Sequence, residues 1–248
     1  ISRSKEIEYV ELYSLFVNDK SIFVGTATGL YQSNDNGDTW TLSSLVQNVR
    51  SLVVSGGILF AGTDSGIYLS TDNGGTWNRI NPDMNVAYLW DIEIHGNDIY
   101  AATEFGIFKS VDNGATWNIT GMTNKDVRSI TIKNNTLFAG TWGEGVYISQ
   151  NGGTSWTQSN QGLQATAVTA MLTTLNGDLY AGTFNGGLYK SVDNGASWTK
   201  TPLSYQFIWS LGQSANGKIY AGTYGGGVYR SLDNGANWYA INNNLTAT

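Results

Sequence analysis

Apolar and polar side chains alternate in short stretches along this chain, and glycines or polar turn residues interrupt them about every 8–12 residues. Alternation of this kind is typical of half-buried β-strands. No stretch places its apolar residues with the period of an α-helix, so we expect no helix of consequence. Within residues 46–82 the pattern predicts four strands, which are Val49–Val54, Ile58–Thr63, Ile67–Ser70 and Trp77–Ile80.

The four-strand pattern recurs six times with a period of about 40 residues, which indicates a solenoid, a propeller or another array. Four short strands repeated radially form a propeller blade, and a ring leaves no long exposed strand edge. Each repeat is complete in sequence order, and residues 1–8 are a candidate extra edge beside the sixth. We therefore predict an all-β fold: a single six-bladed β-propeller of four-stranded antiparallel blades over residues 1–248. The predicted blades are residues 9–45, 46–82, 83–122, 123–161, 162–204 and 205–248.

One eight-residue phrase, Ser-x-Asp-x-Gly-x-x-Trp, occurs once in every repeat, with Asn151 in place of Asp in the fourth copy. Its core suits a tight hairpin, because Asp and Asn side chains bond backbone amides two residues on and Gly accepts a positive φ. The tryptophan opens the next strand, where its ring can cover the turn, so the phrase is a folding device and a poor candidate for chemistry. Its third-slot residues and tryptophans are Asp35 and Trp40, Asp72 and Trp77, Asp112 and Trp117, Asn151 and Trp156, Asp193 and Trp198, and Asp233 and Trp238.

This phrase resembles the Asp-box, or BNR repeat, of sialidase-like β-propellers. It is also similar to repeats of the photosystem II stability/assembly factor family, of sortilin-type propellers and of some xyloglucanases. In those families the box is structural and lies in the hairpin between the third and fourth strands of a blade, so the resemblance implies Asp-box hairpins here. Because the families differ in what they do, the resemblance predicts the architecture and leaves the function open.

Composition narrows the class of partner. The 248 residues carry a formal net charge of −6, which argues against nucleic acid, since phosphate binding needs clustered Lys and Arg. No apolar run approaches the length of a membrane span, and the absence of Cys excludes disulfides and a thiol nucleophile. The chain begins at Ile1 without a signal-like segment, so we expect a mature or excised piece of a larger multidomain protein. A surface rich in Asn, Thr, Ser and Gly resembles secreted bacterial proteins, and we expect a secreted or periplasmic location.

Function is expected where the repeats differ, because the shared positions serve folding. Three tryptophans, Trp90, Trp142 and Trp209, lie outside the boxes. In a four-stranded blade the loop between strands 2 and 3 lies on the same face as the entry to strand 1, and the box lies on the opposite face. Trp142 is in such a loop, whereas Trp90 and Trp209 open strand 1. We therefore expect all three on one face, around the mouth of the central channel.

The same two positions can be followed through all six repeats. The strand-1 entries are Tyr13, Arg50, Trp90, Arg128, Thr169 and Trp209, and the loop positions are Ala27, Asp64, Glu104, Trp142, Phe184 and Tyr224. Aromatic residues and Arg carry much of the binding energy in recognition surfaces. The ligand-binding residues that we predict are Arg50, Trp90, Glu104, Arg128, Trp142, Phe184, Trp209 and Tyr224. The alternative is that these side chains belong to the propeller core, with the arginines paired to acids such as Asp91.

These features favour a non-catalytic binding propeller that recognises a peptide or a glycan at the channel mouth. The resemblance to assembly factors favours a protein partner, and the flat aromatic rings favour a sugar. We expect no cofactor and no metal site. The single histidine, His95, lies in a turn on the box face, and the Asp-rich turns lack the ladder of oxygen ligands that calcium prefers.

The alternative function is a glycoside hydrolase of sialidase-like fold. In the family resembled, a sialidase uses three arginines, whereas only Arg50 and Arg128 of the five arginines here fall at the predicted mouth. The arginine-containing motif that precedes sialidase repeats is also absent. A generic glycosidase pair needs two carboxyl groups about 5–9 Å apart, one of them with a raised pKa. Candidate carboxylates are Asp64, Asp91, Glu104 and Glu144.

Overall fold

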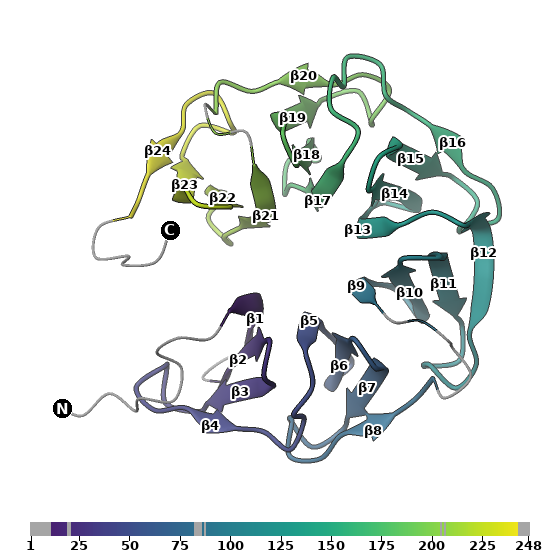
Figure 1. The fold of residues 1–248 in the computed structure, drawn as a ribbon, viewed down its shortest axis with the longest axis vertical. Coiled ribbons are helices and arrows are strands. Elements are labelled where there is room, and N and C mark those ends of the chain that lie inside the picture. The colour runs from purple at the N-terminus through teal and green to yellow at the C-terminus, as the bar shows by residue number, and fades with distance from the viewer. Residues whose placement is uncertain are drawn as a thin grey trace. The chain divides into compact units, whose positions relative to one another are not determined.

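A computed structural model gives the fold of residues 11–18, 21–81, 86, 88–203, 205 and 207–242. The candidate edge strand at residues 1–8 lies outside these ranges. The chain divides into two compact units at residues 119 and 120, and each is described by itself. Six four-stranded antiparallel sheets follow one another along the chain (Figure 1), so the predicted six-bladed β-propeller fold is confirmed. Among the described residues every regular element is a strand, and none of them forms a helix that could cross a membrane.

The first unit contains three sheets, and in each the strands pair in the order in which they occur in the chain. Blade 1 consists of β1 (Leu12–Asn18), β2 (Ser21–Thr26), β3 (Leu30–Ser33) and β4 (Thr41–Leu42). Blade 2 consists of β5 (Val49–Ser55), β6 (Ile58–Thr63), β7 (Gly66–Ser70) and β8 (Asn78–Arg79). Blade 3 consists of β9 (Leu89–His95), β10 (Asp98–Thr103), β11 (Gly106–Ser110) and β12 (Asn118–Thr123), whose last residues belong to the second unit.

The second unit contains three sheets with the same strand order. Blade 4 consists of β13 (Val127–Lys133), β14 (Thr136–Thr141), β15 (Gly145–Ser149) and β16 (Thr157–Gln158). Blade 5 consists of β17 (Val168–Thr173), β18 (Leu179–Thr183), β19 (Gly187–Ser191) and β20 (Thr199–Lys200). Blade 6 consists of β21 (Ile208–Gln213), β22 (Ile219–Thr223), β23 (Gly227–Ser231) and β24 (Tyr239–Ala240).

Each Asp-box forms the hairpin between the third and fourth strands, and the second copy shows how its side chains close the turn. The Ser70 hydroxyl donates to Asp72 Oδ1 at 2.7 Å and accepts the amide of Gly74 at 2.9 Å. Asp72 accepts both the amide and the hydroxyl of Thr76, each at 2.8 Å. The indole N–H of Trp77 donates to the carbonyl of Gly74 at 3.2 Å. The turn is therefore held by its own side chains, as the sequence predicts.

Two details of that prediction are wrong. The box aspartate bonds the amide four residues on, as Asp72 does to Thr76, and not two residues on. The strand predicted from Trp77 is β8, which begins one residue later, because the Trp77 indole turns back to the Gly74 carbonyl and belongs to the hairpin.

The Gly-Thr pair at the end of the second strand has two structural roles. A Cβ at Gly62 would overlap the Leu89 side chain at the start of the next blade, so only glycine allows this approach. Thr63 is fully buried, and its hydroxyl donates to the carbonyl of Gly66 at 2.9 Å, which closes the loop between strands 2 and 3. The equivalent hydroxyl bond recurs in all six blades.

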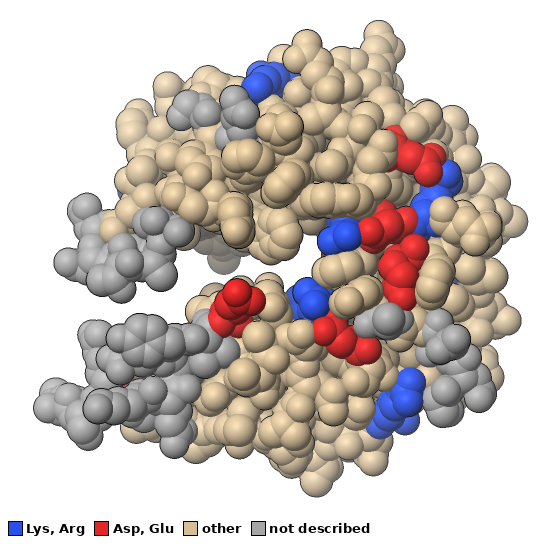
Figure 2. Space-filling model, viewed as in Figure 1, with Lys and Arg blue, Asp and Glu red and all other residues tan. Residues whose placement is uncertain are grey.

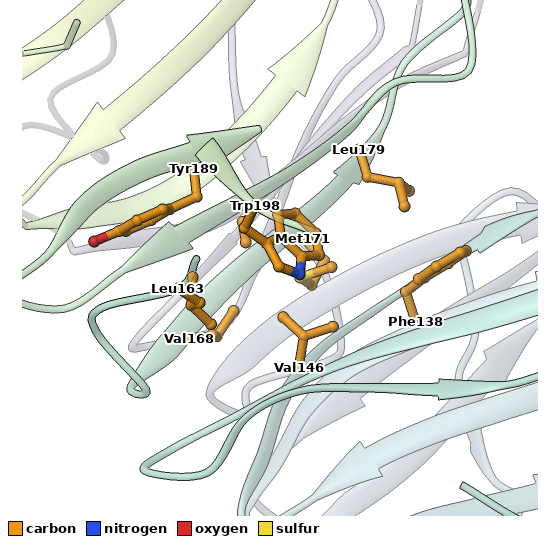
Figure 3. Close-up of a cluster of buried hydrophobic side chains, with 9 residues drawn as sticks. Phe138, Val146, Leu163, Val168, Met171, Leu179, Tyr189 and Trp198 are labelled. Atoms are coloured by element: carbon orange, nitrogen blue, oxygen red, sulfur yellow. The ribbon is translucent and has the colours of Figure 1, made fainter. Parts of the chain in front are cut away.

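The fifth box is an exception. Trp198 is 3% exposed, and its indole N–H donates to the carbonyl of Ser159 at 2.9 Å instead of to its own Gly195. The other five box tryptophans donate to the glycine of their own turn. Trp198 instead packs in the core between blades 4 and 5 with Leu163 and Met171 (Figure 3).

The box aspartates are acidic beyond the usual range. The pKa is lowered to about 2 at Asp35, Asp72, Asp112 and Asp193. At Asp72 the largest cause is the backbone amide of Thr76, followed by the hydroxyls of Ser70 and Thr76. Hydrogen bonds of this kind stabilise the ionised carboxylate and so lower its pKa.

We predict that Trp198→Ala destabilises the fold by about 3–5 kcal/mol, because it removes a fully buried aromatic ring from a packed core. Trp156→Ala, in the neighbouring box, removes a partly exposed ring and should cost less. Urea unfolding of both variants measures the two costs. Equal losses for Trp156→Ala and Trp198→Ala would contradict the distinct packing of Trp198.

We also predict that stability falls as the pH is lowered from about 4 towards 2. The box carboxylates have a folded pKa of about 2, below the unfolded value of about 3.9. Their contribution is therefore complete above the unfolded pKa and is lost as the pH falls through the folded pKa. Thermal melting across this range measures the loss, and Asp72→Asn, which imitates the Asn151 box, should give a shallower dependence. If the stability of Asp72→Asn depends on pH as strongly as that of the wild type, this explanation is wrong.

Candidate functional site

The strand 2–3 loops lie against the segments that lead into strand 1, as predicted for one common face. The amide of Trp142 donates to the carbonyl of Asp126 at 2.8 Å, which also forms part of the approach to β13. Blades 5 and 6 repeat the arrangement through the amides of Phe184 and Tyr224, and the first unit does so through Glu104. Within each unit the two predicted sets of positions therefore meet.

Arg50 in the first unit is paired within its own blade. Its Nε donates to Asp64 Oδ1 at 2.5 Å and its Nη2 to Asp64 Oδ2 at 3.2 Å, while Asn48 donates to the same carboxylate at 2.6 Å. Both side chains of the pair are largely buried. The predicted ligand-binding arginine is thus neutralised by an acid of the same predicted site.

Three aromatic rings from blades 1 and 3 surround the Arg50 guanidinium of blade 2. Its central carbon lies 4.6 Å from the ring centroid of Trp90, 5.1 Å from that of Tyr13 and 5.6 Å from that of Tyr88. Tyr88 stacks on Trp90 with centroids 5.3 Å apart. Cation–π contacts of this kind fix the rings in place. Arg50 therefore supports an aromatic platform whose outer member, Tyr88, is exposed.

Arg128 in the second unit shows the same design. It donates to Asp126 through Nε at 2.8 Å and Nη2 at 2.6 Å, and its central carbon lies 4.6 Å from the ring centroid of Trp142. The acid here stands two residues before the arginine, whereas Arg50 takes its acid from the strand 2–3 loop. In both units a paired arginine lies beneath an aromatic ring.

A continuous series of aromatic contacts crosses blades 4 to 6. Ring centroids are 5.2 Å apart from Trp142 to Phe184, 5.0 Å from Phe184 to Phe207 and 6.5 Å from Phe207 to Tyr205. The Tyr205 hydroxyl donates to the carbonyl of Tyr224 at 2.9 Å.

The Tyr224 ring, 69% exposed, lies 6.4 Å from that of Trp209. The aromatic strip, as we call it, consists of Trp142, Phe184, Phe207, Tyr205, Tyr224 and Trp209. Four of its six members were predicted as ligand-binding residues, and they form one connected surface in the second unit. On the face seen in Figure 2, the surface over blades 5 and 6 is largely without charged side chains.

Sequence comparison of the repeats missed four contributors: Tyr88, Asp126, Tyr205 and Phe207. Three of them stand two residues before the strand-1 entry, at a position that also holds Asn48 and Glu11. Comparison of this third position across the six repeats would have identified Tyr88, Asp126 and Phe207. Tyr205 has no such regular place, because it lies in the longer segment that precedes β21.

The carboxylates considered for hydrolysis have different surroundings. Asp64 is bound to Arg50, and Glu144 accepts Lys125 Nζ at 2.6 Å, which lowers the pKa of Glu144. Glu93, missed in the sequence, lies on β9 beside Asp91, and burial followed by the Asp91 charge raises its pKa to about 8. Among the described residues, no three His, Asp or Glu side chains gather in a way that could hold a metal ion.

Comparison with known families identifies the repeats. The profile described as DUF6242 beta propeller domain matches residues 122–247, and the BNR/Asp-box repeat matches residues 68–79, around the second box. The resemblance to Asp-box propellers is therefore confirmed. No curated protein matches the chain.

Solved structures share the fold at low sequence identity. YCF48 bound to D1 peptide is 20% identical with a TM-score of 0.73, and the match covers 92% of this chain and 80% of that one. YCF48 from Cyanidioschyzon merolae is 16% identical with a TM-score of 0.73, covering 96% and 86%. The Niastella koreensis GH74 enzyme is 20% identical with a TM-score of 0.70, covering 94% of this chain but 37% of the enzyme. At these identities the likeness shows the fold alone.

We predict that Asp64→Asn destabilises the fold by about 1–3 kcal/mol, because the largely buried Arg50 guanidinium loses its ionic partner. Asp38→Asn, at an exposed position of the first box, is the matched control and should leave stability unchanged. Chemical unfolding of both variants measures the difference. A wild-type stability for Asp64→Asn would show that the pair does not hold Arg50 in place.

Proposed function

The chain belongs to the family described as the DUF6242 beta propeller domain, and from that premise we propose that it is a non-catalytic module that recognises a polypeptide segment through the aromatic strip. The observation that carries the proposal is the series of ring contacts from Trp142 through Phe184 and Phe207 to Tyr205. The Tyr205 hydroxyl bond to the Tyr224 carbonyl joins this series to the ring pair of Tyr224 and Trp209, and Trp142, Trp209 and Tyr224 are exposed. Large exposed apolar surfaces of this kind mark interaction sites in soluble proteins.

The strip is preorganised, which favours recognition. Its rings are held by one another, by the Tyr205 hydroxyl bond and by the Arg128–Asp126 pair beneath Trp142. Rings that are already ordered lose little conformational freedom when a partner binds, so more of the contact energy contributes to affinity. Aromatic anchors are also the side chains that most often dominate binding energy.

The chemistry of the strip favours an uncharged, apolar segment. Arg128 donates to Asp126 from both Nε and Nη2, so its charge is already balanced within the blade. A series of rings across three blades is long enough to receive several apolar side chains of an extended peptide. The structural neighbour YCF48, which was solved with a D1 peptide, supports a peptide ligand for a propeller of this type.

A neutral glycan is the second candidate for the same strip. Tyr224 and Trp209 expose flat ring faces of the kind that stack on sugar rings. The raised pKa of Glu93 supports the further alternative of a glycoside hydrolase, because a carboxyl that stays protonated near neutral pH can act as a general acid. Turnover of fluorogenic glycosides that is lost in Glu93→Gln would favour that alternative.

We predict that Trp142→Ala and Tyr224→Ala each weaken peptide binding by about tenfold or more, because each removes an anchor ring. The probe is a displayed peptide library, and the affinity of the selected peptides is measured by titration calorimetry. Tyr239→Ala is the matched control, because Tyr239 is 57% exposed but lies on the outer strand β24.

Three outcomes would count against the peptide proposal. Selected peptides that bind all three variants equally would place their site elsewhere. Selection of no peptide, together with glycan-array binding that requires Tyr224, would favour the glycan. An equal loss in Tyr239→Ala would indicate a general effect on folding.

A further inference from the structure

A polar groove lies in the second unit, on the side of the Asp-boxes and separate from the aromatic strip. Its volume is about 640 Å³, which is within the range of small-molecule sites. One wall comes from the outer strands and box of blade 4, and the other from the box of blade 5. The residues that carry the argument are Gln150, Asn151 and Thr157 on the first wall and Asp193, Asn194 and Ala196 on the second.

The two boxes that form the groove are the two that depart from the repeat. In the second box, Trp77 donates both to its own Gly74 carbonyl and to the hydroxyl of Ser43, so its indole bridges to the preceding blade. In the fifth box, Trp198 is turned inward to the Ser159 carbonyl and is buried. Trp198 therefore also bonds to the preceding blade, but its buried ring does not line the groove between blades 4 and 5.

The fourth box changes the charge of the groove. It holds Asn151 where the other five boxes hold aspartate, so this wall presents an amide in place of a carboxylate. The Asp193 carboxylate of the opposite wall accepts hydrogen bonds from Ser191 and Ser197 of its own turn. Neither Lys nor Arg is among the described residues that line the groove. The Lys133 ammonium beside the groove is directed to the carbonyl of Gly177 and to Asn194 Oδ1, so the lining itself presents no cation to an anionic ligand.

Several lining groups have hydrogen-bonding capacity to spare. Among the described residues, the side chains of Gln150 and Thr157 have no hydrogen-bond partner, and Asn194 uses only its amide oxygen, which accepts Lys133 Nζ. Amide and hydroxyl groups both donate and accept, which matches the hydroxyl groups of a sugar. Ile148 and Ala196 add the small apolar surface that the C–H face of a sugar ring needs.

We propose that this groove is a binding site for a neutral carbohydrate of one or a few sugar units. The site would act independently of the aromatic strip, so its test does not depend on the peptide proposal.

The probe is a panel of neutral oligosaccharides, with uronic-acid and sialic-acid oligosaccharides as charged controls. Binding to the whole chain is detected by saturation-transfer NMR and measured by calorimetry. Ala196→Trp fills the groove with an indole, and Ala236→Trp places the same ring at the same slot of the sixth box as a matched control. Gln150→Ala removes one exposed amide without adding bulk.

We expect at least one neutral oligosaccharide to bind, with affinity lowered about tenfold or more by Ala196→Trp and unchanged by Ala236→Trp. Gln150→Ala should weaken the same ligand, and the charged controls should not bind. The proposal is overturned if no neutral member of the panel binds. It is equally overturned if Trp142→Ala abolishes sugar binding while Ala196→Trp and Gln150→Ala leave it unchanged.

Discussion

The hairpin closed by a serine hydroxyl, an aspartate and an indole is the interaction on which the rest of the structure depends. A two-residue fourth strand such as β8 makes too few ladder bonds to be held by its backbone alone. The box replaces them with side-chain bonds that join Ser70, Asp72 and Gly74 and that tie Trp77 to the same turn. Because the turn asparagine adopts a positive φ, for example 56° at Asn73, the phrase also fixes a backbone form that few residues accept.

With the outer hairpins fixed by their own side chains, the other end of each blade is free to vary. The threonine at the end of strand 2, which is buried in blades 1 to 5, closes the opposite loop in every blade, whatever the loop contains. Loops of different length and chemistry can therefore follow the same strand. This division explains why aromatic rings gather at the strand 2–3 loops, while the box face keeps nearly constant residues.

The sequence predicts the fold well because folding information is repeated six times in it. Spacing, glycine positions and the box phrase each point to the same strands, and errors such as the start of β8 are a single residue. The inward orientation of Trp198 could not be predicted, because its box has the same conserved-slot residues, Ser, Asp, Gly and Trp, as the other Asp-containing boxes. Trp198 packs with Leu163 and Met171, which lie outside the phrase.

The candidate site was predictable in part of its aromatic members but not in its ion pairing. Repeat comparison predicts that Arg128 and Trp142 lie near each other, yet it does not identify the acid with which each arginine pairs. Arg50 takes Asp64 from a loop, whereas Arg128 takes Asp126 from two residues away. These choices depend on side-chain geometry within each blade. As a result, Arg50 and Arg128, which were predicted to bind a ligand, instead support the neighbouring aromatic rings.

That internal pairing has a kinetic consequence. A face with free cations draws oppositely charged partners from a distance and associates faster at low ionic strength. Here each guanidinium is compensated within its own blade, so its field decays as that of a local dipole. The two guanidiniums therefore add little to the long-range attraction of an anionic partner.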